Sequence, residues 1–193
     1  MLESVESRAS KHDLELVALA ATGGREAFGE LVRRHGSAVR ALLRRMGADG
    51  ALADDLAQDA FLAAFERIVE FRGEGAFQGW VKRIAARLYV KRWRRDARLD
   101  LMAELPELAA EPGLGEAGAA LRIDLDEALK SLSPAERVCV SLCYGGGFSH
   151  GETALALNTP LGTVKSHVKR GLDKLRARLA PGDGGGLETT AHG

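Results

Sequence analysis

Residues 71–95 constrain the fold more than any other stretch of this sequence. They read FRGEGAFQGWVKRIAARLYVKRWRR, a Gly-spaced turn followed by a helix rich in Arg and Lys. Counted at a helical period, one side of that helix is an apolar stripe made of Val81, Ile84, Ala85 and Leu88. A helix with one apolar stripe needs a core to pack on, so the flanking segments must supply that core.

The other sides of this helix are basic and aromatic. One face consists of Trp80, Arg83, Arg87, Lys91 and Arg94, and a further strip consists of Lys82, Tyr89 and Trp93. Cations neutralise phosphates and flat rings offer surfaces for unpaired bases, so the pattern favours contact with a nucleic-acid strand. The alternative is a solvated basic face with a Trp buried at the helix start, and the pattern alone leaves it open.

Charge is strongly segregated along the chain, although the formal net charge of its 193 residues is zero. Between Lys82 and Arg98 the only acid is Asp96, whereas between Asp100 and Glu127 the only base is Arg122. This asymmetry indicates a polyanion site beside an acidic tether. A zero net charge argues against a simple DNA-coating protein, and the length suits one ordinary domain or two small ones.

Other classes of function find little support in the sequence. We expect a cytoplasmic protein without a membrane span, because there is no long apolar run and no signal-peptide pattern. No nucleophile–base pair, phosphate-binding loop or metal-ligand cluster is found, so we expect no enzyme, no cofactor and no metal. Cys139 and Cys143 stand one helical turn apart; a metal or redox role is possible chemistry, but buried small residues are the favoured interpretation.

The predicted fold class is all-α, with two small helical domains joined by an acidic linker. The first domain spans 13–98 and holds helices from about Asp13 to Thr22, from Glu26 to Met46 with a bend near His35, and from Leu52 to Glu70. Pro and Gly mark the linker at 99–122, with a short helix near 101–108. The second domain spans 123–180, and 181–193 is expected to be a flexible tail.

The helix predicted from Leu52 is apolar over too wide an arc. Its core stripe is Leu52, Leu56, Ala60 and Ala63, and a second side carries Phe61, Leu62, Phe65 and Val69. Carboxylates and one amide are mixed with this second side, namely Asp54, Asp55, Gln58 and Asp59. Such a side either packs on another helix or stays exposed for a partner, and both interpretations are open.

The last third of the chain has sharp helix signals. Ser133-Pro134-Ala135-Glu136 and Ser149-His150-Gly151-Glu152 are two capping boxes, and Pro160 suits the start of a helix that ends near Leu179. In that last helix the outward positions are Thr163, Ser166 and Arg170, flanked by Lys165, His167 and Lys169. A short helix, a tight turn and a polar, basic second helix form a helix-turn-helix, which reads base edges in the major groove. Helical hairpins of this size are also found in purely structural roles.

Four stretches together resemble one family, the extracytoplasmic-function (ECF) group of bacterial sigma factors. The first is 54–62 (DDLAQDAFL). The second is 71–85, which begins with FRGE, contains Trp80 and ends with RIA. The third and fourth are 132–137 (LSPAER) and 162–166 (GTVKS). They occur in the family's order, and the resemblance extends from about Asp13 to Leu179. It implies a non-catalytic subunit in which 13–98 is the N-terminal sigma domain and 123–180 is the C-terminal helix-turn-helix domain.

The resemblance also implies partners and the residues that meet them. The partners are core RNA polymerase, promoter DNA and an anti-sigma factor. Core polymerase would be gripped by Asp54, Asp55, Gln58, Asp59, Phe61, Leu62 and Phe65. The −10 element would be read and melted by Phe71, Arg72, Phe77, Gln78, Trp80, Lys82, Arg83, Arg87, Lys91 and Arg94. The −35 duplex would be read by Thr163, Lys165, Ser166, His167, Lys169 and Arg170.

The chain departs from the family pattern at several of these positions. Arg87 and Lys91 stand where Asn and Asp are frequent, and both changes add positive charge. Gly75 and Gly79 replace bulkier or capping residues in the loop that would hold a flipped base. In the second domain, His150-Gly151 stands where acidic residues are common and His167 stands where Arg is frequent. Because of the changes at Arg87 and Lys91, base specificity is not carried over from the family.

Two other functions compete with a sigma factor. One is a free-standing helix-turn-helix regulator whose N-terminal part dimerises; tight binding to a specific duplex without polymerase would favour it. The other is a sigma mimic that titrates an anti-sigma factor without touching DNA. The regulator leaves Trp80 and the basic face unexplained, and a mimic has no need of them.

Overall fold

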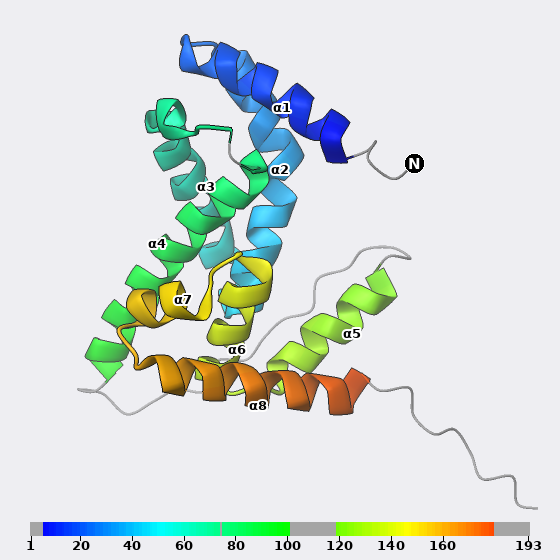
Figure 1. Cartoon of the computed structure of the whole chain (residues 1–193), viewed down its shortest axis with the longest axis vertical. Coiled ribbons are helices and arrows are strands. Elements are labelled where there is room, and N and C mark those ends of the chain that lie inside the picture. Colours follow the sequence, from blue (N-terminus) through cyan, green and yellow to red (C-terminus); the bar gives the residue numbers. More distant parts are fainter. Residues whose placement is uncertain (1–5, 74, 101–118, 180–193) are drawn as a thin grey trace, which may run out of the picture.

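The computed structural model is all-helical in the part of the chain that it describes, residues 6–73, 75–100 and 119–179 (Figure 1). Its elements, in chain order, are α1 (Glu6–Ala21), α2 (Arg25–Met46), α3 (Gly50–Glu66), the 3₁₀ turn η1 (Ile68–Glu70), α4 (Phe77–Asp100), α5 (Ala119–Lys130), α6 (Pro134–Val140), the π-helical turn η2 (Ser141–Gly145), α7 (His150–Leu157) and α8 (Leu161–Leu179).

Helices α2, α3 and α4 form an upright bundle, with α1 across its upper end (Figure 1). Two residues, Gly47 and Asp49, account for the reversal of chain direction between α2 and α3. Gly47 adopts φ 118°, a left-handed conformation that glycine tolerates, and its N–H bonds to the Arg44 carbonyl. Asp49 then caps α3 by accepting a hydrogen bond from the Leu52 N–H at 2.8 Å. The predicted helix at 26–46 is confirmed, but it continues through His35 and Gly36 as one helix.

A buried carboxylate fixes α1 to α2. Asp13 accepts hydrogen bonds from Arg34 Nη1 at 3.2 Å and pairs with His35 Nε2 at 2.8 Å. Both partners are on α2, so a polar group that would be costly to bury is satisfied across the helix pair. The structure also begins α1 at Glu6, several residues before the predicted start at Asp13.

The C-terminal helices pack around a second buried carboxylate. Glu136, which is 4% exposed, completes the capping box with Ser133 and pairs with Lys174 Nζ of α8 at 2.7 Å. Both capping boxes predicted from sequence are confirmed. Between α7 and α8, Asn158 takes φ 52°, the left-handed conformation that ends α7 and makes the tight turn.

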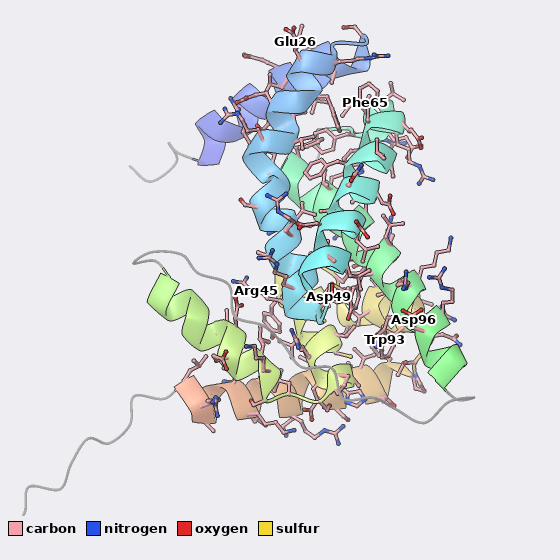
Figure 2. All side chains as sticks on the ribbon, turned by 180° about the vertical axis from the view of Figure 1, so that it is seen from behind. Glu26, Arg45, Asp49, Phe65, Trp93 and Asp96 are labelled. Atoms are coloured by element: carbon pink, nitrogen blue, oxygen red, sulfur yellow. The ribbon has the colours of Figure 1, made fainter. Side chains whose placement is uncertain are left out.

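The two sets of helices are docked on each other. Buried residues from both sets contribute to one apolar cluster that includes Leu43 of α2 and Leu142 of η2. At the lower end of α2, Arg137 donates from Nε to the Arg45 carbonyl at 2.8 Å and from Nη2 to the Arg44 carbonyl at 2.6 Å. Figure 2 shows Arg45 at this end of the bundle.

Two expectations from the sequence need correction. The helix predicted to run to Glu70 ends at Glu66 and is followed by η1. The predicted linker at 99–122 is entered by helix from both sides, since α4 continues to Asp100 and α5 begins at Ala119. The short helix expected at 101–108 and the tail at 181–193 lie outside the described residues.

Candidate nucleic-acid and partner interfaces

The long helix α4 presents the cations predicted from its sequence. Arg83, Arg87 and Lys91 are exposed, and Arg94 is half-buried beside them. We call these four residues the basic face of α4. Their spacing places them along one side of the helix, where successive phosphates of a strand would meet them.

An open groove of about 890 Å³ lies along the lower part of this face. Seven of its ten lining residues belong to α4 and the others to α3 and α7: Leu56, Asp59, Arg87, Leu88, Val90, Lys91, Arg92, Arg94, Arg95 and Ala156. Trp93 and Asp96 mark the same end of α4 in Figure 2. Lys82 is half-buried to one side, where desolvation, and then the nearby Arg45, lower the pKa of its ammonium.

The aromatic residues at the start of α4 form one cluster. Phe71, Phe77 and Trp80 have ring centroids 5.4–5.8 Å apart. Phe77 is only 1% exposed and packs on His35, so in this structure it supports the cluster from below and cannot itself stack on a base. Phe71 and Trp80 are half-buried and keep part of their surface. The predicted contact of Phe77 with DNA stays a prediction, and in this structure the ring has almost no exposed surface.

Tyr89 also faces the core and not the outer strip predicted for it. Its side chain is 6% exposed, and its hydroxyl donates a hydrogen bond to the Met46 carbonyl at 2.8 Å. Desolvation raises the pKa of Tyr89 to about 12. Val90 and Ala86 are buried beside it, so the buried side of α4 is wider than the predicted stripe.

Two further residues predicted at this surface lie near the turn that precedes α4. Arg72 is exposed and Gln78 is half-buried near the turn, so both are on the same end of α4 as Trp80. Gly73 and Gly75 take positive φ of 74° and 91°, which makes this turn one that other residues enter at a cost. Residue 74 is outside the described part of the chain.

The upper end of the basic face meets the C-terminal helices. Arg83 Nη2 donates to the Gly147 carbonyl at 2.7 Å, and Nη1 lies 3.6 Å from Glu152 Oε1. Its guanidinium carbon is also 5.9 Å from the centre of the Phe148 ring. Arg83 is thus engaged within the chain, whereas among the described residues no hydrogen bond or ion pair is made by Arg87 or Lys91.

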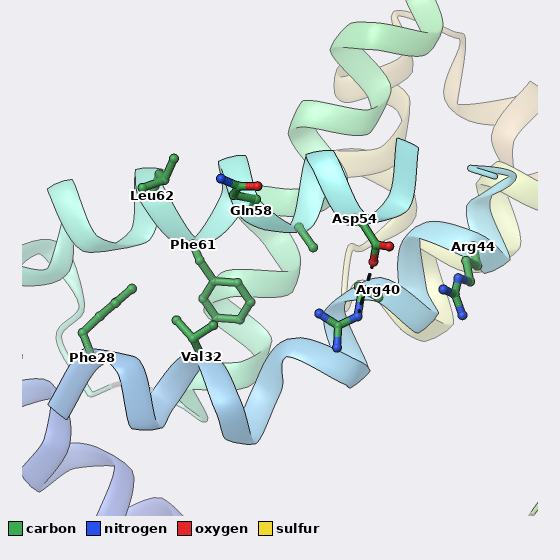
Figure 3. A pocket seen from close by; sticks show the side chains of 9 residues that line it. Phe28, Val32, Arg40, Arg44, Asp54, Gln58, Phe61 and Leu62 are labelled. Atoms are coloured by element: carbon green, nitrogen blue, oxygen red, sulfur yellow. Dashed lines mark ion pairs between the residues drawn. The ribbon is translucent and has the colours of Figure 1, made fainter. Parts of the chain in front are cut away.

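A second groove, of about 800 Å³, runs between α2 and α3 (Figure 3). Figure 3 shows the Phe61 ring against Val32 and Phe28 at its apolar end, with an Asp54–Arg40 ion pair of 3.6 Å at the other. The full lining is Phe28, Val32, Arg40, Arg44, Asp54, Ala57, Gln58, Phe61 and Leu62. Leu62 is 56% exposed at its rim.

The residues predicted to bind core polymerase lie in different places in the structure. Asp54, Gln58, Phe61 and Leu62 line the α2–α3 groove. Asp59 lines the other groove beside α4, and Asp55 is exposed but lines neither. Phe65 packs on Phe28 with ring centroids 4.9 Å apart. The over-wide apolar arc is thus explained by both alternatives: part of it packs on α2, and part remains exposed.

Helices α7 and α8 have the predicted helix-turn-helix form. The buried side of α8 includes Val164, Val168 and Leu175. On its outer side Thr163, Lys165, Ser166, Lys169 and Arg170 are exposed and His167 is half-buried. Two of these are held locally: Ser166 Oγ donates to the Gly162 carbonyl at 2.9 Å, and Arg170 Nη2 lies 3.1 Å from His167 Nδ1.

Three residues at the docking contact were missed by sequence reasoning. Arg137, Phe148 and Glu152 connect to residues more than sixty positions away, so no local pattern points to them. Glu152 was recognised only as part of a capping box, and Arg137 only as part of the 132–137 stretch that resembles the family. Cys139 in this region is buried and Cys143 is half-buried; desolvation raises the pKa of Cys139 to about 11, in keeping with a packing role.

The described residues show neither a metal-binding cluster nor a membrane-spanning helix. Residues 6–73, 75–100 and 119–179 contain no group of three or more His, Cys, Asp or Glu that would hold a metal ion. Within the same ranges, no helix combines the length and apolar character that crossing a membrane requires.

Comparisons with known proteins agree with this architecture. The protein-family model of Sigma-70 region 2 matches residues 31–99, and the family model of Sigma-70 region 4 matches residues 122–175. The ECF RNA polymerase sigma factor SigE of Mycolicibacterium smegmatis is 36% identical over 83% of this chain and 65% of its own length. The ECF RNA polymerase sigma factor SigM of Mycobacterium tuberculosis H37Rv is 34% identical over 90% of this chain and 85% of SigM.

A solved structure shares the fold. The sigma factor RpoE of Bartonella quintana, crystallised with the anti-sigma factor NepR, superposes with a TM-score of 0.54 at 24% identity, over 79% of this chain and 96% of RpoE. Regions 2 and 4 follow one another in this chain in the order of those proteins, on the two sets of helices described above. The chain therefore belongs to the ECF group of RNA polymerase sigma factors, non-catalytic subunits that bind core polymerase and direct it to promoters.

Proposed function

We propose that this sigma factor divides its work among three surfaces, on α3, α4 and α8. The observation that carries the proposal is that the two reading helices are both present and chemically distinct: α4 is basic with aromatic residues at its start, and α8 is polar and basic along its outer side. Domain bounds of 13–98 and 123–180 accommodate this division, with α4 and α5 extending into the stretch 99–122 between them. We also propose that the protein acts in the cytoplasm, where polymerase is found.

Core polymerase binds the groove between α2 and α3. This groove combines an apolar end at Phe61 and Leu62 with exposed polar groups at Asp54 and Gln58. A partner helix with apolar residues and cations on one face fits that combination. Exposed Leu62 gains most from burial, because it is half in water in the free protein.

The experiment on this groove is co-purification with core polymerase. Leu62→Ala is expected to weaken retention without unfolding the protein, and Val69→Ala on η1 is the matched control, since it is also exposed and lies outside the groove. Phe65→Ala is a poor choice because its ring packs on Phe28. Equal retention of both variants would remove the groove from the polymerase interface.

The start of α4 reads the −10 element as a single strand. Phe71 and Trp80 keep exposed ring surface for an unpaired base, and the basic face of α4 neutralises the phosphates that follow. Phe77 holds the two rings in place from beneath. Because Gly75 and Gly79 give this turn an unusual shape for the family, the base it accepts has to be measured.

Helix α8 reads the −35 element as duplex. Its N-terminal outer residues Thr163, Lys165 and Ser166 are exposed and follow the tight turn at Asn158, which is where a recognition helix meets base edges. Lys169 and Arg170 follow on the same exposed side and suit phosphate contacts.

An anti-sigma factor is the proposed negative regulator. Support comes from the RpoE fold match, which was solved with NepR, an anti-sigma factor. For this chain the corresponding experiment is recovery of a partner that blocks core binding and is displaced by core polymerase.

Run-off transcription tests the whole proposal. Core polymerase with this protein is expected to start at defined promoters, mapped genome-wide after overexpression. A Lys165→Ala, Ser166→Ala pair is expected to reduce initiation while leaving core retention intact, and Leu62→Ala to reduce both. Core binding without promoter selection would instead leave the chain a sigma mimic.

A further inference from the structure

On the basic face of α4, Arg83 is the residue that is already in contact with the C-terminal helices. Its guanidinium meets a carbonyl, a carboxylate and an aromatic face, all from the segment 147–152. These are the kinds of group that a nucleic-acid strand would offer it: oxygen acceptors, negative charge and a flat ring. The segment 147–152 therefore imitates a strand at one end of α4.

Glu152 supplies the charge in this contact. It lies at the start of α7, where the Ser149 N–H donates to its carboxylate at 2.8 Å and its own backbone N–H donates to Ser149 Oγ at 3.1 Å. Those bonds, followed by the charges of Arg83 and Arg87, lower the pKa of the Glu152 carboxyl. A fixed anion is thus presented to two residues of the basic face, in the position where a phosphate would be expected.

The other reading helix is not covered in this way. Thr163, Lys165, Ser166 and Lys169 on α8 are exposed in the same docked arrangement. Docking consequently masks one end of the single-strand surface and leaves the duplex-reading surface free.

We propose that the docked C-terminal helices are a built-in competitor for single-stranded promoter DNA, with Glu152 and Phe148 occupying the Arg83 end of α4 until the two sets of helices separate. The proposal rests on the assignment of α4 as the single-strand reader. The dissociation constant of the free protein for a strand is then the intrinsic constant divided by the fraction of molecules that are undocked, so docking weakens binding. Core polymerase relieves this when it holds the two sets of helices at promoter spacing.

Two variants open the docked form by different physical routes. Glu152→Gln keeps a side-chain oxygen for the Ser149 N–H and removes only the charge facing Arg83. Gly145→Leu acts as a wedge with no change in charge, because a Cβ at Gly145 would lie 2.8 Å from Leu42 Cδ1 of α2. Glu127→Gln is the control: it is the same chemical change on α5, where Glu127 pairs with Lys130.

The measurements are fluorescence anisotropy with labelled oligothymidine and the radius of gyration from X-ray scattering, on full-length protein whose helicity is checked by circular dichroism. We expect Glu152→Gln and Gly145→Leu to enlarge the radius and to tighten oligothymidine binding about threefold or more, with Glu127→Gln unchanged. Unchanged affinity in both opening variants would overturn the proposal, whatever their radius. Tighter binding without expansion would also overturn it, since charge removal and not opening would then be responsible.

Arg87→Ala in the Gly145→Leu background separates this proposal from the assignment of α4. Arg87 is exposed, lines the basic groove and takes no part in the Arg83 bonds. If its loss leaves oligothymidine binding unchanged, α4 is not the single-strand reader. If its loss weakens binding while opening has no effect, α4 is the reader and only the competition fails.

Discussion

Removal of the Arg137 side chain is expected to loosen the docking of the C-terminal helices on α2. The guanidinium donates two hydrogen bonds to carbonyls in the last turn of α2, from Nη2 to Arg44 at 2.6 Å and from Nε to Arg45 at 2.8 Å. A positive charge at a helix C-terminus is also favoured by the helix dipole. Burial lowers the pKa of Arg137 but leaves it charged, because the ordinary pKa of a guanidinium is far above neutral.

The magnitude follows from what replaces these bonds in Arg137→Ala. Hydrogen bonds to a charged group contribute about 1.5–3 kcal/mol each. Arg137→Ala loses two such bonds, but the net destabilisation is smaller than their sum because each carbonyl keeps another hydrogen-bond donor. The Arg44 carbonyl keeps its bond from the Gly47 N–H, and the Arg45 carbonyl keeps one from Ser141 Oγ at 3.1 Å. We therefore expect a net loss of about 2 kcal/mol, which lowers the docking constant by a factor of about 30.

Urea unfolding is the assay, with the radius of gyration as a second readout. Wild-type protein is expected to unfold with a higher midpoint than Arg137→Ala, and the variant to show a smaller slope because less surface is buried between the two sets of helices. Arg137→Lys retains the charge without the two-pronged geometry, so it should lie between them.

Arg176→Ala is the control for this prediction. Arg176 is on α8, and its partner among the described residues is the exposed Asp173, so its loss should change stability by less than about 0.5 kcal/mol. If Arg137→Ala is as stable and as compact as Arg176→Ala, the two carbonyl bonds do not hold the modules together.

Three further predictions test single groups. Burial raises the pKa of Tyr89 from 10.0 to about 12. The resulting contribution to the free energy of unfolding, at most about 3 kcal/mol, is present below pH 10.0 and is lost as the pH rises towards about 12. Tyr89→Phe should remove this loss of stability at alkaline pH, as measured by urea titrations. Lys174 holds the pKa of Glu136 below 4.5, so Glu136 stabilises the protein above that pH and ceases to do so as the pH falls through its lowered pKa; Glu136→Gln should destabilise by about 1–2 kcal/mol at neutral pH and little in acid. Arg87→Ala should reduce the salt dependence of oligothymidine binding by about 0.7 in the logarithmic slope, and an unchanged slope would remove Arg87 from phosphate contact.

Local signals predicted the helices well because caps and breakers act within a few residues. Ser133 and Ser149 each bond to the Glu three positions later, as their spacing predicts, and Asn158 turns the chain where the sequence indicates. The helix is not interrupted near His35, where the sequence predicted a bend, and tertiary contacts support it there. His35 is held by Asp13 of α1 and packs on Phe77, so contacts from two other helices support the helix through this point.

The aromatic residues show why side-chain roles were harder to predict. Periodicity placed Tyr89 outside, beside Trp93, but Tyr89 satisfies the Met46 carbonyl at the end of α2 and is drawn inward. The distance along the chain between these two residues is 43 positions, and no local pattern contains it. Phe77 is likewise buried by residues from other helices.

The docked arrangement gives the zero net charge of this protein a structural meaning. A chain with equal numbers of acids and bases would be expected to have little pull on a polyanion. Its charges, however, are sorted: the basic face of α4 faces outward, while Glu152 on α7 lies opposite Arg83 and Asp126 on α5 lies 3.2 Å from Arg45. When the C-terminal helices separate from α2 and α4, both arginines lose their acidic partners at once. Opening therefore raises the positive potential of the N-terminal helices without any change in net charge, so separation of the two sets of helices and the capacity to hold a strand are linked by the same ion pairs.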